Sequence, residues 1–180
     1  MNSMKSIFFF LATITVASAA DFQIDSQKSW LKVDCKATGH SWTSQVKNFD
    51  AKISGDATTM TPSAASITWK FSDIDSAESD RDEKMLKWLN ATTNPTGSWK
   101  MTKQWKDSSG QQYVSGPLTI AGVSKDITIP VKSCPCTSGM MLDGDVWIDT
   151  TDFGLPIIRM VVLTVNPKVN IRFHLEGSVR

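Results

Sequence analysis

The stretch 30-WLKVDCKA-37 alternates between apolar and charged side chains almost residue by residue. One face would carry Leu31, Val33, Cys35 and Ala37, and the other would carry Lys32, Asp34 and Lys36. Successive side chains of a β-strand point to opposite faces, so this alternation predicts a half-buried strand with its apolar face toward a core.

The same alternation recurs along the chain, in 67-ITWKF-71, 114-VSGPLTI-120, 127-ITIPV-131 and 169-VNIRFHLEG-177. Turn residues separate these runs at Thr61-Pro62-Ser63, Asn94-Pro95-Thr96-Gly97, Asp107-Ser108-Ser109-Gly110 and Asp143-Gly144. About eight strands at regular spacing favour a closed antiparallel barrel, which removes exposed sheet edges; a two-sheet sandwich is the alternative. We predict an all-β fold.

One segment, 79-SDRDEKMLKWLN-90, instead has the pattern of a short amphipathic helix. Ser79 or Asp80 is the expected N-cap, and the apolar stripe would consist of Met85, Leu86, Trp88 and Leu89. A helix this short is marginal alone and must pack its stripe on something. We expect it to close one end of the barrel, either as a fixed plug or as a lid over a pocket.

The N-terminus is typical of a secretory signal peptide, with Lys5, the apolar run 7-IFFFLATITV-16 and the small residues 17-ASAA-20. We therefore predict a signal peptide at residues 1–20 and a single domain at residues 21–180, exported to the periplasm or secreted. The richest later apolar run, 155-LPIIRMVVLTV-165, contains Arg159 and is bounded by prolines, so we expect no stable membrane insertion.

Charge and motif content exclude several classes of function. Without Lys5 the chain has 18 basic and 18 acidic residues, which does not suit a nucleic-acid partner. The histidines, His40 and His174, lie far apart, with His174 on the polar face of its strand, and no nucleophile elbow, phosphate loop or HExxH pattern occurs. We predict no enzyme activity, no catalytic residues, no cofactor and no metal.

The segment 133-SCPCTSGMM-141 leaves one alternative open. Cys134 and Cys136, followed by Met140 and Met141, offer soft sulfur ligands that suit Cu(I), and an oxidised thiol loop is the simpler interpretation outside the cytoplasm. Strand parity places Cys134 and Cys136 away from the interior and Cys35 toward it.

Three blocks resemble the YceI-like family of exported lipid- and polyisoprenoid-binding proteins. Arg81-Asp82-Glu83-Lys84-Met85 is similar to the family's RDxHL, 116-GPLTIAGVSKDITIPV-131 to its GxLTIxGVTxxVxxxV, and 149-DTTDFGL-155 to its block ending in DFG. The chain departs from the family pattern at Lys84, Pro117, Ala121 and Thr151. The resemblance implies a lipocalin-like barrel that holds an isoprenoid or similar lipid.

The candidate ligand-binding residues lie on the apolar faces of the predicted strands. They are Phe49, Ile67, Trp69, Phe71, Leu118, Ile120, Val146, Ile148 and Phe173, with Trp88 and Leu89 closing the mouth and Arg81 meeting a charged head group. The alternative is a fully packed structural or interaction module, in which Trp99 and Trp105 would form a protein-binding surface. A homodimer is compatible with either interpretation.

Overall fold

Each alternating stretch forms a strand in the computed structural model, which describes residues 19–136 and 139–179. The longer strands are β1 (Ala19–Ile24), β2 (Trp30–Ala37), β3 (His40–Val46), β4 (Phe49–Asp56), β5 (Thr61–Lys70), β7 (Thr96–Lys100), β9 (Gln112–Ile120), β10 (Val123–Cys136), β11 (Gly139–Asp149) and β14 (Lys168–Val179). The shorter elements are η1 (Phe71–Asp73), β6 (Ile74–Asp75), α1 (Ser79–Trp88), β8 (Lys103–Lys106), η2 (Thr150–Phe153), β12 (Arg159–Met160) and β13 (Leu163–Thr164).

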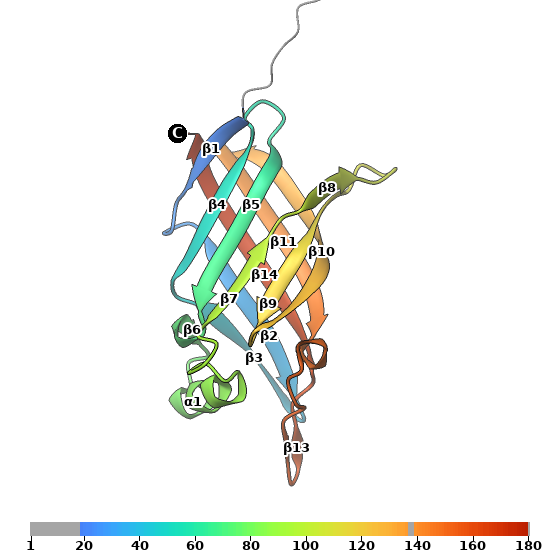
Figure 1. The fold of residues 1–180 in the computed structure, drawn as a ribbon. Helices are drawn as coiled ribbons and strands as arrows, with labels where there is room; N and C mark the ends of the chain where they lie inside the picture. The colour runs from blue at the N-terminus through green and yellow to red at the C-terminus, as the bar shows by residue number, and fades with distance from the viewer. Residues whose placement is uncertain (1–18, 137–138, 180) are drawn as a thin grey trace, which may run out of the picture.

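Eight strands close into an antiparallel barrel, as predicted. The order around the ring is β1-β4-β5-β7-β9-β10-β11-β14, and β14 pairs back to β1 through Phe22 and Val179. Beyond β1, the same edge of β14 pairs with β2, which continues into β3 and β6. The pairs β1/β2 and β4/β3 therefore act as two long bent strands of one wall (Figure 1).

Two predicted turns are wrong. Thr61, Pro62 and Ser63 begin β5, and the turn lies before them at residues 57–60. Asp143 and Gly144 lie inside β11, where Gly144 is paired with Phe173 of β14. A Cβ atom at Gly144 would collide with the Phe173 ring, so the glycine provides the space in which that ring lies across its neighbouring strand. The same relation holds between Gly97 of β7 and the indole of Trp69 on β5.

The two ends of the barrel differ. At the end near the C-terminus, Phe22, Met140 and Leu175 are buried in the core. At the other end, helix α1 and the β12–β13 hairpin flank the mouth, and the hairpin extends beyond the barrel (Figure 1). No residue of α1 is fully buried, so the helix rests on the mouth and does not penetrate it.

The predicted side-chain cap of the helix is also wrong. The N-cap is Glu78, and it makes no capping hydrogen bond through its side chain. The helix start is instead held by Asp82, whose carboxylate accepts hydrogen bonds from the backbone N–H of Ser76 (3.1 Å) and from its hydroxyl (2.6 Å). The segment before the helix is thus tied to the first turn by a side chain three residues inside it.

Candidate functional site: an apolar cavity in the barrel

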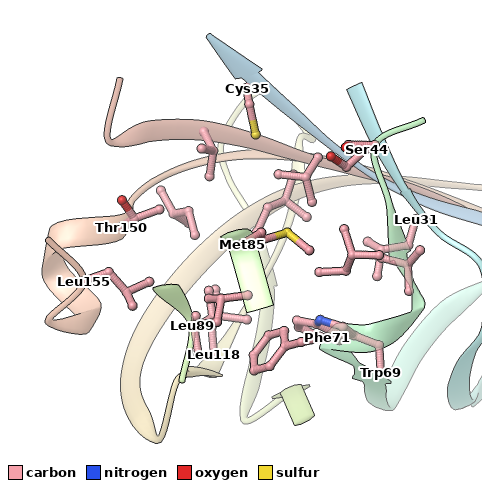
Figure 2. Close-up of a pocket in the computed structure, with 18 of the residues that line it drawn as sticks. Leu31, Cys35, Ser44, Trp69, Phe71, Met85, Leu89, Leu118, Thr150 and Leu155 are labelled. Carbon is pink, nitrogen blue, oxygen red and sulfur yellow. The ribbon is translucent and has the colours of Figure 1, made fainter. Parts of the chain in front are cut away.

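The barrel encloses a cavity of about 530 Å³ that reaches the mouth between α1 and the β12–β13 hairpin. Its wall is overwhelmingly apolar, because the inward-facing positions of the alternating strands meet there. Figure 2 shows side chains from the barrel wall, the helix and the η2 region around one space, including Leu31, Trp69, Phe71, Met85, Leu89, Leu118 and Leu155.

Almost all of the predicted site residues line this cavity. The lining includes Ile67, Trp69, Phe71, Arg81, Trp88, Leu89, Leu118, Ile120, Val146, Ile148 and Phe173. Phe49 is the exception: it is half-buried against the core and lines a different hollow, together with Lys47 and Lys52. Phe49 begins β4 directly after the bend at residues 47–48, where strand parity no longer predicts which side chain faces the lumen.

Arg81 lies at the rim of the cavity in a fixed position. Its Nε donates to the Ser76 hydroxyl (2.9 Å), its Nη2 donates to the Ser76 carbonyl (3.0 Å), and its guanidinium carbon lies 4.7 Å from the Trp42 ring centroid. Asp82 accepts from the same serine, so Arg81 and Asp82 are linked through Ser76. This arrangement pre-orients a cation at the mouth and anchors the helix.

The helix is tied to the opposite rim by one hydrogen bond. The indole Nε1 of Trp88 donates to the carbonyl of Pro156 at 2.8 Å, and Pro156 leads into the β12–β13 hairpin. Trp88, Met85 and Leu89 all line the cavity from the helix side. Three of the four residues predicted for the stripe therefore cover the mouth, and Leu86 packs against the core without lining the cavity.

A few polar groups interrupt the apolar wall. Ser44 and Thr150 are buried there, and the buried Nε1 of Trp99 has no hydrogen-bond acceptor among the described residues. A buried N–H donor without an acceptor is costly, so this indole N–H destabilises the wall. Burial also raises the pKa of the Cys35 thiol to about 11, which keeps this lining group neutral.

The structure corrects the assignment of Trp99. The alternative interpretation placed Trp99 on a protein-binding surface, but only 8% of it is accessible, because it alternates with Lys100 and Ser98 on β7 and points inward. Trp105 is half-buried, with its ring stacked on Tyr113 at 5.5 Å between centroids. Of the two, Trp99 belongs to the cavity wall.

Sequence reasoning also missed part of the lining. Trp42 and Ser44 of β3 line the cavity. They alternate with outward-facing polar residues, but β3 is so polar that this alternation is a weak signal in the sequence. Ile157, Ile158 and Val165 reach the cavity from the hairpin region, which carried no clear strand pattern.

The histidines do not form a common site. His174 faces outward as predicted but is partly covered, since its ring stacks on Trp30 and its Nδ1 lies 2.7 Å from Asp143. His40 stacks on Trp42 at the mouth, with 5.4 Å between ring centroids.

The thiol alternative gains little from the geometry. Cys134 is the cross-strand partner of Met141, outside the barrel, and Cys35 lines the lumen, as strand parity predicted. Within residues 19–136 and 139–179, no cluster of three or more His, Cys, Asp or Glu side chains is arranged to hold a metal ion. Binding of Cu(I) stays a prediction, to be checked by titrating the wild type against a Cys134→Ser/Cys136→Ser variant.

Comparison with known proteins assigns the family. The model of the YceI-like domain matches residues 22–177, nearly the whole described chain. The chain belongs to the YceI-like family. A UPF0312 protein from Pseudomonas aeruginosa (strain LESB58) is 28% identical over 178 residues, covering 93% of this chain and 91% of that protein. Another, from Ectopseudomonas mendocina, is 31% identical over 121 residues, covering 64% of this chain and 63% of that protein, less than two thirds of its length.

Three solved structures share the fold. Burkholderia cenocepacia BcnA has a TM-score of 0.75 at 21% identity, covering 85% of this chain and 98% of that chain. A polyisoprenoid-binding domain from Saccharophagus degradans has a TM-score of 0.66 at 15% identity, covering 91% and 100%. The Campylobacter jejuni YCEI protein has a TM-score of 0.62 at 16% identity, covering 99% and 94%. At these identities the likeness establishes the barrel.

Proposed function

We propose that this YceI-like protein is an exported, non-enzymatic carrier that holds an isoprenoid or similar lipid in its barrel. The observation that carries the proposal is the apolar cavity of about 530 Å³, which lies within the range of roughly 300–1,000 Å³ typical of small-molecule pockets. A fully packed barrel, the main alternative, does not agree with that cavity.

The chemistry of the wall suits a long hydrocarbon. Each buried CH₂ contributes roughly 0.8 kcal/mol, so a chain molecule needs few polar contacts to bind. Arg81 would meet an anionic head at the rim. The structure of a polyisoprenoid-binding domain with the same fold supports this ligand class.

Export is part of the proposal. It rests on the signal-peptide pattern of residues 1–20, of which only Ala19 and Ala20 fall within the described residues, at the start of β1. Among the described residues, no helix has the length and hydropathy needed to cross a membrane. Mass spectrometry of the protein recovered from its own host would locate the processed N-terminus, and an unprocessed chain would contradict export.

Ligand binding is tested with a variant that places a large side chain inside the cavity and a matched variant that places it outside. Cys35 lines the lumen, and Lys36, the next residue on β2, is exposed on the outside. We expect native mass spectrometry with lipid extraction to find an apolar species on the wild type and on Lys36→Trp, but not on Cys35→Trp. An empty wild type that also ignores added polyprenols would contradict the proposal.

A further inference from the structure

The tip of the β12–β13 hairpin exposes apolar side chains to an unusual extent. Val161 is 104% exposed, Val162 87% and Met160 58%, and together they form a continuous stretch of the chain. We name Met160–Val162 the hairpin tip. Scattered exposed apolar residues are ordinary, but three in a row at the end of a projection mark an interaction site.

The hairpin is a built projection and not a frayed loop. Its own strands pair Arg159 with Thr164 and Met160 with Leu163. Its base is fastened to the β2–β3 end of the barrel, where Thr38 donates to the Thr164 carbonyl at 3.0 Å and Asn166 donates to the Lys36 carbonyl at 2.8 Å. Figure 1 shows that this anchored hairpin projects farther than α1 at the mouth.

The apolar surface of the hairpin runs without a break into the cavity. Ile158, Leu163 and Val165 line the cavity from the hairpin, and Met160 both lines the cavity and is largely exposed. A hydrocarbon chain would therefore pass from the tip to the lumen along apolar side chains.

The charge around the tip is positive. The segment 153–168 contains Arg159 and Lys168 and no acidic residue, and the adjoining β2–β3 end contributes Lys36; all three are exposed. Asp149 lies opposite Lys168 across the β11–β14 pair, and Glu78, Asp80 and Asp82 lie at the mouth on the helix side. Among the described residues, Arg159 and Lys36 are therefore the cations of the hairpin side without a facing carboxylate on a paired strand. Apolar residues flanked by cations complement a bilayer that has anionic head groups above a hydrocarbon interior.

We propose that the β12–β13 hairpin docks the protein reversibly onto anionic lipid bilayers, with the hairpin tip inserted among the lipids and the cavity mouth turned toward the membrane. Docking is inferred from the hairpin alone. A role of docking in loading or unloading the cavity rests on the function proposed above. Insertion is confined to the tip, so the protein remains peripheral.

The test is flotation of the mature protein with vesicles. Wild type is expected to float with vesicles of phosphatidylcholine mixed with phosphatidylglycerol and to bind vesicles of phosphatidylcholine alone more weakly. Val161→Asp/Val162→Asp should lower the partition coefficient at least about tenfold, since two apolar anchors become anions. The control is Val179→Asp, a single aspartate at an exposed valine at the opposite end of the barrel, and it should bind as wild type does.

A second pair of variants separates the charge contribution. Arg159→Gln/Lys168→Gln should reduce binding to the anionic vesicles by roughly fivefold to thirtyfold and leave binding to neutral vesicles unchanged. Wild type that stays unbound at low salt, or tip variants that float as wild type does, would overturn the proposal. Loss of self-association in the tip variant, without vesicle binding by wild type, would overturn it in favour of a protein partner.

Docking and cavity binding are scored separately. A fluorescent apolar probe added without vesicles reports the cavity alone, and the tip variant is expected to bind it with the wild-type affinity. If vesicle binding fails while the probe binds, docking is wrong and the proposed function stands. If the probe fails while vesicles bind, the cavity proposal is wrong and docking stands.

Discussion

The two ends of the barrel are built from similar apolar residues but treat them in opposite ways. At the end near the C-terminus, Phe22 is 5% exposed and Met140 1%, because β1, β4 and β14 close over them. At the mouth, Met85 is only half-buried and Val161 is fully exposed. The chain buries its apolar residues at one end and leaves them accessible to solvent at the other.

This difference separates stability from function. A residue that the chain buries tightly contributes to the folding free energy, whereas an apolar residue left accessible contributes little to folding. Its exposure makes sense when another molecule covers it. The closed end therefore forms the floor of the cavity. The mouth is the part that a ligand or another surface can contact.

The largest contrast is expected in stability. Met140→Ala leaves a cavity in the closed end and should lower the free energy of unfolding by about 2–5 kcal/mol. Val161→Ala at the hairpin tip should change it by no more than about 0.5 kcal/mol. Urea unfolding of both variants measures the two values. Equal losses would show that the hairpin tip packs on the protein and would break the comparison.

The reactivity of the Cys35 thiol measures how far the inside of the cavity is shielded from solvent. The pKa of Cys35 is raised by burial from 9.0 to about 11, so near pH 8 its thiolate fraction should be about a hundredfold below that of an ordinary thiol. In a Cys134→Ser/Cys136→Ser background, alkylation should be correspondingly slow and should accelerate with pH until about 11.

A bound lipid should slow the Cys35 reaction further, because it would fill the space beside the thiol. Denatured protein supplies the unperturbed rate as control. Alkylation of the native protein at the denatured rate would show that the mouth leaves the lumen open to water and reagent.

The strands and the closed barrel were predictable because alternation is a local property of the chain. Leu31, Val33 and Cys35 were placed on the inner face from spacing alone, and the structure agrees. Phe49 was misplaced because it follows a bend, and Gly144 was taken for a turn although it lies under the Phe173 ring across the sheet. The first error comes from a local break in the alternation, and the second from a neighbour that is distant along the chain.

The open cavity was not predictable from spacing. Alternation fixes which side chains face the lumen, but the volume left over depends on how side chains from opposite walls meet.

The hairpin was missed for a different reason. Its apolar run at 155–165 is too short and too charged to span a bilayer, and only the fold reveals that its centre projects into solvent.

The helix side of the mouth offers a test of how firmly it is held. Asp82→Ala removes the acceptor of the Ser76 N–H and hydroxyl and should cost about 1.5–3 kcal/mol, with faster amide exchange across residues 76–90. The matched control is Asp80→Ala, which removes an exposed carboxylate from the same first turn. If both variants behave alike, the helix dipole, and not the link to Ser76, holds this rim.

The smallest effect is expected at the bond that joins the two rims. Trp88→Phe keeps an aromatic ring over the cavity but removes the donor to the Pro156 carbonyl, and should cost about 0.5–1 kcal/mol. If ligand passes between α1 and the hairpin, release of a fluorescent apolar probe should become roughly twofold to fivefold faster in stopped-flow measurements.

Trp147→Phe is the control for this bond, because Trp147 is 65% exposed on the outside of β11 and should leave release unchanged. Faster release in Trp88→Phe alone would identify the gap between the rims as the exit. Unchanged release in both would mean that the rims do not part when ligand leaves. The accessible apolar surface of the mouth would then serve docking only, and the route into the cavity would lie elsewhere in the wall.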